Sequence, residues 1–330
     1  MSATTMDVFF SPAYGKLYEE IEGGTCETFD FRCEFGQVRN VFIRRKVPFE
    51  TGPEGLYDIT TPYGYGGPVI VETSDPDRLV RAYEAEFSRY CSDRRIVSEF
   101  IRFHLFDNGA VRERFSGEVV QAGQNIVRSC DFPLDLIWMD FEHKVRKNVK
   151  RAQAEGLAIE IDRNGEGLGS FLEIYYNTME RNQASEYYRF SRDFFERLNR
   201  DLRGRYAYFH VLKNGRVVST ELVLFSQRYA YSFLGGTKEE FFALRPNDFL
   251  KYEIIRWCRE SGIEKFVLGG GYRKDDGIFR YKKSFAPSGE VPFYVGRRVH
   301  DPASYEALVE ERRKTGASLE PTGYFPAYRA

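Results

Sequence analysis

The pattern of apolar and polar residues predicts a chain built mainly of strands, with helices between them. Three apolar runs in the second half alternate as half-buried strands do: residues 206–212, 217–225 and 229–234. Asn214 and Gly215 separate the first two runs, and a type I′ hairpin turn needs positive φ at both of its central residues. A helix is predicted over residues 247–260 and a short strand over 265–268, directly before three glycines. Together these elements predict an α/β half-domain.

The rest of the chain shows a similar succession of elements. Strands are predicted over residues 25–35, 38–47, 57–60, 96–105, 118–129 and 157–161. Helices are predicted over residues 13–22, 75–89, 167–181, 191–201 and 301–314. A further helical region begins near Pro133 and ends at Gly156. Because helices followed by strands occur twice in the same order, we expect a duplicated architecture.

Composition limits the size, the partners and the compartment of the protein. The chain has 330 residues, which suits two domains, and its 42% hydrophobic residues supply a large core. The 48 basic and 49 acidic residues give a net charge of −1, so no overall field attracts nucleic acid or an anionic membrane. Five scattered cysteines and four histidines show neither disulfide nor zinc spacing. No apolar run is long enough to span a membrane and no signal peptide pattern is present, so we expect a cytoplasmic protein without a metal.

The most unusual local sequence covers residues 57–68. A short predicted strand runs into a loop that contains three glycines, with Tyr63 and Tyr65 among them. Glycines let the backbone approach a ligand closely, and tyrosines offer both ring faces and hydroxyls. We interpret this stretch as a binding loop, and a purely structural turn is the alternative. The candidate substrate contacts here are Tyr57, Asp58, Tyr63, Tyr65 and Gly66.

Two basic clusters are candidates for binding an anion. The first runs from Arg44 to Lys46 at the end of a predicted strand, and the second has five basic residues and no acid within residues 144–151. In the second cluster Val145 and Val149 follow helical spacing, so the cations would face outward. Such clusters are commonly solvated surfaces. The alternative is contact with a phosphate or with a tRNA backbone, where each cation adds salt-dependent affinity.

Six motifs in matching order resemble those of the FemABX-like branch of the GNAT acyltransferase superfamily, over about residues 10–295. They are Tyr57-Asp-x-x-x-Pro62-Tyr-Gly-Tyr-Gly-Gly-Pro68, Arg146-Lys-Asn-x-Lys-Arg-Ala152 followed by Gly156, Thr178-Met-x-Arg-Asn182, Leu234-Gly-Gly-Thr237, Gly269-Gly-Gly271 and Tyr281-Lys282-x-x-Phe285. The resemblance implies an α/β (α+β) fold with two tandem GNAT-type domains, whose mixed, largely antiparallel sheets are flanked by helices. It also implies transfer of an acyl or aminoacyl group to an amine, without a metal or a covalent enzyme intermediate.

The domain boundaries follow from these motifs and from the predicted elements. We expect the first GNAT-like domain over residues 1–152 and the second, which carries the catalytic lysine, over residues 153–300. Residues 301–330 are expected to form a C-terminal helix and a tail that packs back on the first domain.

The resemblance assigns the catalytic role to Lys282. In this branch the last motif usually reads Phe-Lys-x-x-Phe, and here Tyr281 takes the place of the first phenylalanine. A fixed ammonium beside the donor carbonyl stabilises the tetrahedral oxyanion as it forms, whereas a surface lysine is the alternative. Glu221 lies in an otherwise apolar strand, where burial makes a carboxylate a stronger base, so it is the candidate for deprotonating the attacking amine. Asp140 is a weaker candidate, and proton transfer without any enzymic base is a rival.

Further candidate contacts come from the same motifs and from the basic clusters. For the substrate they are Arg44, Lys46, Arg181, Tyr188, Asn247, Gly270 and Tyr281. For a tRNA or another phosphate-bearing donor they are Arg146, Lys147, Lys150, Arg151 and Lys283.

The donor is predicted from the residues that precede the helix at 247–260. A GNAT enzyme that uses acyl-CoA cradles pyrophosphate on a glycine-rich turn at a helix amino end. Here that turn has no glycine, Pro246 lacks an N–H and Asp248 adds negative charge. We therefore expect an aminoacyl-tRNA-dependent N-aminoacyltransferase that has charged tRNA as donor, no cofactor, and an amine of a cell-wall precursor or natural-product intermediate as acceptor. An acyl-CoA-dependent N-acetyltransferase is the alternative, and a catalytically silent tandem-GNAT binding protein is a third possibility.

Overall fold

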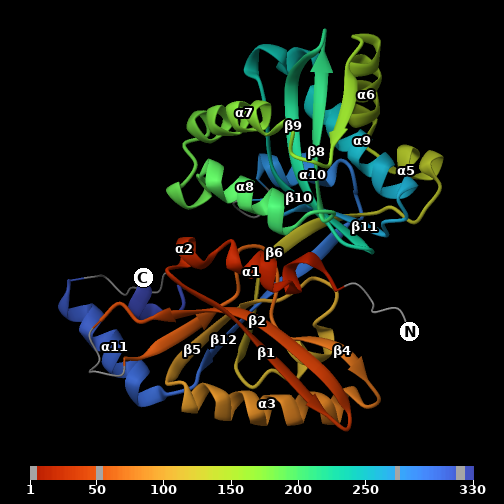
Figure 1. Cartoon of the computed structure of the whole chain (residues 1–330). Coiled ribbons are helices and arrows are strands. Elements are labelled where there is room, and N and C mark those ends of the chain that lie inside the picture. The colour runs from red at the N-terminus through yellow and green to blue at the C-terminus, as the bar shows by residue number, and fades with distance from the viewer. Residues whose placement is uncertain (1–5, 50–54, 272–275, 317–323) are drawn as a thin grey trace. The chain divides into compact units, whose positions relative to one another are not determined.

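The computed structural model describes residues 6–49, 55–271, 276–316 and 324–330. The chain forms two compact units, and each unit is assembled from two separate stretches of sequence. The amino-terminal unit consists of residues 9–122 and 292–330. The carboxyl-terminal unit consists of the residues up to 8 and of residues 123–291. The elements of both units are labelled in Figure 1.

The amino-terminal unit contains a mixed sheet. In spatial order its strands are β1 (Gly24–Cys33), β2 (Gly36–Lys46), β3 (Tyr57–Thr60), β5 (Ile96–Arg102) and β12 (Glu290–Val299), and β4 (Val69–Thr73) pairs with β2. Strands β3 and β5 run parallel, because helix α3 (Pro76–Asp93) lies in the crossover between them. The strands predicted over residues 25–35 and 38–47 are thus confirmed as the antiparallel pair β1 and β2. The predicted helix over residues 75–89 is confirmed as α3, which Asp75 caps as a short acidic side chain at an N-cap does.

Apolar side chains of α3 and of the sheet form the core of this unit. Leu79, Tyr83 and Phe87 recur at helical spacing on one side of α3 and pack against Phe42 and Val38 of β2. The remaining helices of the unit are α1 (Pro12–Lys16), α2 (Glu19–Glu22), α4 (Gly109–Glu113), α11 (Pro302–Lys314) and the 3₁₀ turns η1 (Val8–Phe10) and η4 (Ala327–Arg329). A separate cluster joins Leu308 of α11 and Tyr328 of η4 to β5 through Val97.

The carboxyl-terminal unit contains a second mixed sheet. In spatial order its strands are β6 (Glu118–Ser129), β11 (Lys265–Gly269), β10 (Tyr229–Thr237), β9 (Arg216–Phe225), β8 (Tyr206–Lys213) and β7 (Ala158–Asp162). The predicted meander is confirmed as β8, β9 and β10, and its first turn has φ values of 51° at Asn214 and 75° at Gly215. Strands β10 and β11 are parallel, and helix α9 (Pro246–Glu260) connects them.

Helices cover both faces of this second sheet. They are α5 (Leu134–Asp140), α6 (His143–Ala154), α7 (Leu168–Arg181), α8 (Arg192–Asp201), α9, α10 (Gly277–Lys283) and the 3₁₀ turns η2 (Glu186–Tyr188) and η3 (Glu239–Leu244). Phe209 of β8 contacts Trp257 of α9, whereas its neighbour Tyr208 contacts Phe171 of α7. Because successive strand residues point to opposite faces, α9 and α7 lie on opposite faces of the sheet, as Figure 1 also shows.

The division of the chain differs from the predicted boundaries at residues 152 and 300. Strand β6 follows β5 in sequence but pairs with β11, and β12 follows β11 in sequence but pairs with β5. Residues 123–152 therefore belong to the carboxyl-terminal unit, and residues 292–300 belong to the amino-terminal unit. The predicted boundaries follow the order of the sequence, whereas the units are defined by which strand completes each sheet.

No helix within the described ranges is both long enough and apolar enough to cross a membrane.

Candidate functional site

The parallel strands β10 and β11 stay paired over only three residues each. Residues 229–231 pair with residues 265–267, and beyond them β10 continues to Thr237 along β9 alone. The register shifts after Ser232 on the β9 side, and it shifts again after Val267 where β11 pairs with β6. The pairing of β10 with β11 therefore ends at these residues, and the end of such a pairing is a place where a ligand can bond to the backbone.

Lys282 reaches the glycines that follow β11. It lies in the last turn of α10, and Asp276 caps the amino end of this helix by accepting a 2.7 Å hydrogen bond from the Phe279 N–H. The Nζ of Lys282 donates a 2.6 Å hydrogen bond to the carbonyl oxygen of Gly270. Thus the structure brings together the predicted catalytic lysine and the predicted substrate contact Gly270.

The glycine run is required by the close approach of two side chains. A Cβ on Gly269 would lie 3.2 Å from the Nζ of Lys282, and φ at this glycine is 86°, where side chains are disfavoured. A Cβ on Gly271 would lie 2.5 Å from the Oδ1 of Asp276. A side chain at either position would displace the ammonium of Lys282 or the cap that positions its helix.

The charge state of Lys282 is controlled by its surroundings. Burial and the neighbouring ammonium of Lys251 lower the pKa of Lys282 to about 8, while Glu221 and Asp276 act in the opposite direction. The side chain is half-buried and does not extend into bulk water. Because opposite charges interact more strongly away from water, this ammonium can stabilise a nearby oxyanion effectively.

Glu221 is buried, as expected, but it has a partner that the sequence did not reveal. The Nζ of Lys251 donates to the Oε2 of Glu221 and, at 2.7 Å, to the hydroxyl of Ser232. Glu221 is 4% exposed and Lys251 is 6% exposed. The Oε1 of Glu221 is buried and has no hydrogen-bond partner within the described chain. One carboxylate oxygen is therefore engaged by Lys251, and the role of Glu221 as a base stays a prediction.

Lys251 is the main residue that the sequence reasoning missed. It lies on α9 and shares the buried face of this helix with Ile254, Ile255 and Cys258. The sequence places this lysine at i and the three apolar residues at i+3, i+4 and i+7, on one face of the helix. This spacing could have indicated a buried lysine, and because lysines are rarely buried without a partner, it could also have indicated an ion pair.

Two other predicted substrate contacts, Asn247 and Tyr281, bond to each other. The side-chain amide of Asn247 donates a 2.9 Å hydrogen bond to the hydroxyl of Tyr281. Burial raises the pKa of Tyr281 well above its ordinary value, and the carboxylates of Asp248 and Glu221 act in the same direction. The hydroxyl therefore stays protonated and joins the first turn of α9 to α10.

The amino end of α9 carries a buried carboxylate where a phosphate-binding helix has free N–H groups. Asp248 is 8% exposed and accepts a 3.1 Å hydrogen bond from the side-chain amide of Asn148. Burial raises the pKa of Asp248. Pro246 occupies the first turn, and Arg245 has a φ of 60° as the residue before it. An anion bound at this helix end would face the side chain of Asp248, and Pro246 has no N–H to donate to it.

The basic helix α6 contains one cation that bonds to the backbone, Arg146, and four exposed cations, Lys144 among them. The guanidinium of Arg146 donates to the carbonyl oxygens of Met139 at 2.8 Å and of Phe141, at the end of α5. Arg146 therefore has a structural role in closing α5. Lys147, Lys150 and Arg151 are exposed, as the helical spacing predicts. The fifth donor-binding candidate, Lys283, forms an ion pair with Glu290 on β12.

Arg181 and Tyr188 lie at the far ends of other elements of the same unit. Arg181 ends α7, is exposed, and places its guanidinium 5.1 Å from the ring centre of Phe242. Tyr188 lies in η2, and its carbonyl oxygen accepts a hydrogen bond from the hydroxyl of Tyr175. The roles of both residues in substrate binding stay predictions.

The other candidates belong to the amino-terminal unit. Arg44 forms a 2.6 Å ion pair with Glu27, and its guanidinium lies 4.3 Å from the ring centre of Tyr57. Lys46 is exposed at the end of β2, and its carbonyl oxygen accepts a hydrogen bond from Arg329. The structure thus brings Arg44 and Tyr57 together as a stacked pair.

Asp58 has a structural position in place of the expected substrate contact. It is fully buried and forms ion pairs with Arg45 at 2.8 Å and with Arg329 at 2.5 Å. Its Oδ2 also accepts a 3.1 Å hydrogen bond from Tyr328. Both oxygens are therefore engaged within the protein, because the C-terminal residues supply partners that the motif alone could not reveal.

The glycine-containing loop at residues 61–68 is held from inside the amino-terminal unit. The side-chain amide of Asn108 donates to the carbonyl oxygens of Gly66 at 3.0 Å and of Pro68 at 2.6 Å. The ring of Tyr65 packs edge-on against Phe9, with the ring centres 5.2 Å apart, and burial raises its pKa. Tyr63 accepts a 2.7 Å hydrogen bond at its carbonyl oxygen from Tyr14. These contacts support a structural role for the loop, and its role in binding a ligand stays a prediction.

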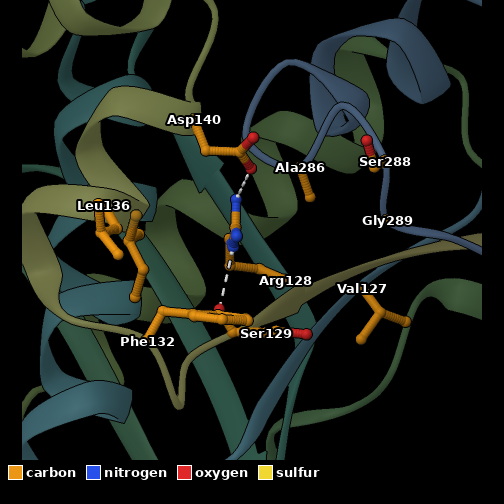
Figure 2. A pocket seen from close by; sticks show the side chains of 10 residues that line it. Val127, Arg128, Ser129, Phe132, Leu136, Asp140, Ala286, Ser288 and Gly289 are labelled. Carbon is orange, nitrogen blue, oxygen red and sulfur yellow. Dashed lines mark hydrogen bonds and ion pairs between the residues drawn. The ribbon is translucent and has the colours of Figure 1, made fainter.

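A separate hollow of about 370 Å³ lies in the carboxyl-terminal unit, and its lining includes neither Lys282 nor Glu221. Its lining residues are Val127, Arg128, Ser129, Phe132, Leu136, Ile137, Asp140, Ala286, Ser288 and Gly289. Figure 2 shows Arg128 directed at the carboxylate of Asp140. The same guanidinium donates to the carbonyl oxygens of Ser129 at 3.1 Å and of Phe285 at 3.2 Å. Asp140, the weaker base candidate, is thus the ion-pair partner of a buried arginine.

The sequence of this unit matches a known enzyme domain. Residues 139–283 match the family described as an acetyltransferase (GNAT) domain. The matched segment contains Lys282, Glu221 and Lys251. No curated protein matches the chain as a whole at a significant level.

Solved structures resemble the chain over almost its whole length. FemX shares 14% sequence identity with it, with a TM-score of 0.72, over 93% of this chain and 95% of FemX. The structure of L-PGS from Bacillus licheniformis also shares 14% identity, with a TM-score of 0.56, over 91% of this chain and 96% of that one. At these identities the likeness establishes the fold, which confirms the predicted FemABX-like resemblance and the mixed α/β class.

Proposed function

We propose that this chain, an acyltransferase with a GNAT domain and the fold of FemX, is an N-aminoacyltransferase that takes its donor from aminoacyl-tRNA. The acceptor is an amine of a cell-wall precursor or of a natural-product intermediate. The observation that carries this proposal is the half-buried ammonium of Lys282. It bonds to the carbonyl oxygen of Gly270, close after the residues where β10 and β11 stop pairing with each other.

The proposed reaction uses this ammonium to stabilise negative charge. The acceptor amine attacks the carbonyl carbon of the aminoacyl ester, and a C–N bond forms while the carbonyl oxygen becomes an oxyanion. Lys282 donates a hydrogen bond to that oxyanion. The C–O bond to the tRNA ribose then breaks, the amide forms, and the proton of the amine ends on the ribose hydroxyl that leaves. Glu221 is the enzymic candidate for carrying this proton, and the leaving ribose oxygen is the alternative acceptor.

The choice of tRNA over coenzyme A is supported by the amino end of α9. Asp248 lies in its first turn and Pro246 lacks an N–H, so the usual cradle for a pyrophosphate is not formed there. The exposed residues Lys147, Lys150 and Arg151 of α6 supply cations that a polyphosphate backbone can pair with.

The second candidate is an acyl-CoA-dependent N-acetyltransferase. It is favoured by the description of the domain that residues 139–283 match. In this case the leaving group is the thiol of coenzyme A, and the role of Lys282 is the same.

One experiment separates the two donors. Purified protein is incubated with a panel of amines and with either radiolabelled aminoacyl-tRNA or radiolabelled acetyl-CoA, and labelled amide is counted. We expect product from aminoacyl-tRNA, and we expect RNase treatment before the assay to abolish it. Product from acetyl-CoA that is insensitive to RNase would establish the second candidate and reject the first.

A further inference from the structure

Three charged side chains from three different elements of the carboxyl-terminal unit converge on the ends of β10 and β11. Glu221 comes from β9, Lys251 from α9 and Lys282 from α10. In the sheet, Glu221 lies opposite Gly235 of β10, and Ser232 of the same strand bonds to Lys251. The charges of two ammonium groups therefore act on one buried carboxylate, and the bonds of the two lysines decide which ammonium this carboxylate neutralises.

The carboxylate is bound by one lysine only. Lys251 forms an ion pair with the Oε2 of Glu221, and its ammonium lies 5.8 Å from the ring centre of Phe266. Lys282 forms no ion pair with any carboxylate of the described chain, and its Nζ bonds to the carbonyl oxygen of Gly270. The Oε1 of Glu221 is buried and has no hydrogen-bond partner there. The unit thus contains a buried acceptor atom without a hydrogen bond from the described residues, and a lysine whose charge interacts with the same carboxylate.

We propose that Lys251 is a positioning residue for acyl transfer: by holding Glu221 in an ion pair, it keeps this carboxylate from pairing with Lys282. The Lys282 ammonium then remains available for the substrate oxyanion. This inference rests on the proposed function, since it names what keeps the catalytic lysine free of a counter-ion.

The physical basis is the strength of charge interactions inside a protein. A buried carboxylate without a partner is costly, so it binds the nearest available cation. In the intact protein this cation is Lys251, whose side chain has a second anchor in Ser232. Without Lys251, Glu221 still faces the charge of Lys282, with which it interacts electrostatically. An ion pair with Glu221 would compete with the oxyanion for the same ammonium.

The titratable groups around Lys282 determine whether its pKa rises or falls when Lys251 or Glu221 is replaced. Lys282 is faced by Lys251, which favours its neutral form, and by Glu221 and Asp276, which favour its charged form. Glu221 is also close to the hydroxyl of Tyr281 and the thiol of Cys258, since their pKa values respond to its charge. Removing the Lys251 charge therefore raises the pKa of Lys282, and removing the Glu221 charge lowers it.

The test measures the titration of Lys282 directly, without any donor. The full-length protein is labelled with trace acetic anhydride between pH 6 and pH 11, and the labelling of the peptide that contains Lys282 is quantified by mass spectrometry. In the unmodified protein, labelling should be half-maximal near pH 8. In Lys251→Met we expect the midpoint to rise by about one pH unit or more. The Glu221 carboxylate then no longer has Lys251 as its partner, so it stabilises the charged form of Lys282.

Two further variants and one control variant make the result decisive. In Glu221→Gln the midpoint should fall, and in the double variant Lys251→Met/Glu221→Gln it should return toward that of the unmodified protein. Lys238→Met removes a lysine from another ion pair of this unit, with Glu173, and should leave the midpoint unchanged. An unaltered midpoint in Lys251→Met, with Glu221→Gln also unaltered, overturns the proposal. If Lys251→Met does not fold, the direction of the Glu221→Gln shift decides alone.

Activity measurements then separate this inference from the proposed function. With whichever donor is consumed, Lys251→Met should lower kcat about tenfold or more with little change in KM, because the lost interaction is made in the transition state. If no donor is consumed but the labelling midpoints shift as stated, the proposed function fails and the positioning role of Lys251 stands. If a donor is consumed but kcat in Lys251→Met is unchanged, the positioning role is rejected and the proposed function stands.

Discussion

At the scale of single residues, the chemistry of the candidate site depends on which groups face Lys282. Its ammonium bonds to one backbone carbonyl, and burial together with Lys251 lowers its pKa to about 8. Glu221 is more deeply buried, at 4% exposed, and is held by Lys251. The two charged side chains thus differ in their partners, because Glu221 is engaged by a lysine and Lys282 by a backbone carbonyl.

Loss of the ammonium should affect the reaction more than donor binding. We expect Lys282→Ala to lower kcat about 100- to 1,000-fold, as removal of an oxyanion donor commonly does, with KM changed much less. Steady-state kinetics with the donor identified above would measure both constants. Equal losses in affinity and in kcat would instead assign Lys282 to ground-state binding.

The pH dependence of the reaction should report the charge of Lys282. The working form is the ammonium and its pKa is about 8, so its contribution is complete well below pH 8 and is lost as the pH rises through this value. The acceptor amine gains reactivity over the same range, so the comparison must be made against Lys282→Arg, whose guanidinium stays charged. We expect the ratio of the rates of the unmodified and Arg proteins to fall above pH 8. A constant ratio up to pH 10 would show that the charge of Lys282 is not used.

At the scale of elements, each helix near the site is positioned by particular bonds. Asp276 caps α10, and the glycines after β11 leave room for Lys282. In α6 the same basic motif supplies one structural residue, Arg146, and the exposed cations that follow it. A cluster of like charges on one helix can therefore serve two purposes, and only the exposed part is available to a nucleic acid.

Reversing two exposed charges of α6 should weaken binding of a tRNA donor. We expect Lys147→Glu/Lys150→Glu to raise Kd for aminoacyl-tRNA, with a larger effect at 50 mM salt than at 200 mM salt, because fewer counterions are released. Filter binding or fluorescence anisotropy at several salt concentrations would measure it. Arg146 is left unchanged, since it closes α5. Lys314→Glu, on exposed α11, serves as the control, and an equal effect of both changes would make α6 an ordinary solvated surface.

At the scale of the whole molecule, the two units are each completed by a strand from a distant part of the sequence. Strand β12 pairs with β5 in the amino-terminal unit, and β6 pairs with β11 in the carboxyl-terminal unit. The C-terminal residues Tyr328 and Arg329 further supply partners to the buried Asp58. Neither half of the sequence therefore contains all the residues of one unit.

Separate expression of the halves tests this arrangement. We expect a fragment of residues 1–152 to lack cooperative thermal unfolding, because it has β5 without its partner β12 and β6 without β11. Co-expression with residues 153–330 should restore a folded complex. Circular dichroism and size-exclusion chromatography would follow both outcomes, and a cooperative transition in the isolated fragment would contradict the prediction.

Removal of the C-terminal residues should also destabilise the protein. A chain that ends at residue 327 lacks Tyr328 and Arg329 and leaves Asp58, which is fully buried, with Arg45 as its remaining ion-pair partner. Loss of a partner from a buried charge costs about 3–5 kcal/mol of the free energy of unfolding. Chemical denaturation would measure this loss. Asp58→Asn in the shortened chain should recover part of it, and the absence of any loss would show that the bonds of Asp58 to the tail contribute nothing.

The sequence by itself determined the local elements and indicated Lys282 as the catalytic candidate. Alternation of period two and turn residues such as Asn214-Gly215 specify strands and hairpins locally, and the predicted meander and the helix over 247–260 were confirmed. The motif with Tyr281 and Lys282 indicated the fold and the catalytic candidate, because such motifs are contiguous in sequence.

Only the tertiary structure decided the partners of each charged group and the limits of the units. The pairing of Glu221 with Lys251, the burial of Asp58 by the C-terminal residues and the exchange of β6 and β12 all join residues far apart in sequence. Local periodicity carries no information about such contacts, since it reports which face of an element is apolar and not which other element covers that face.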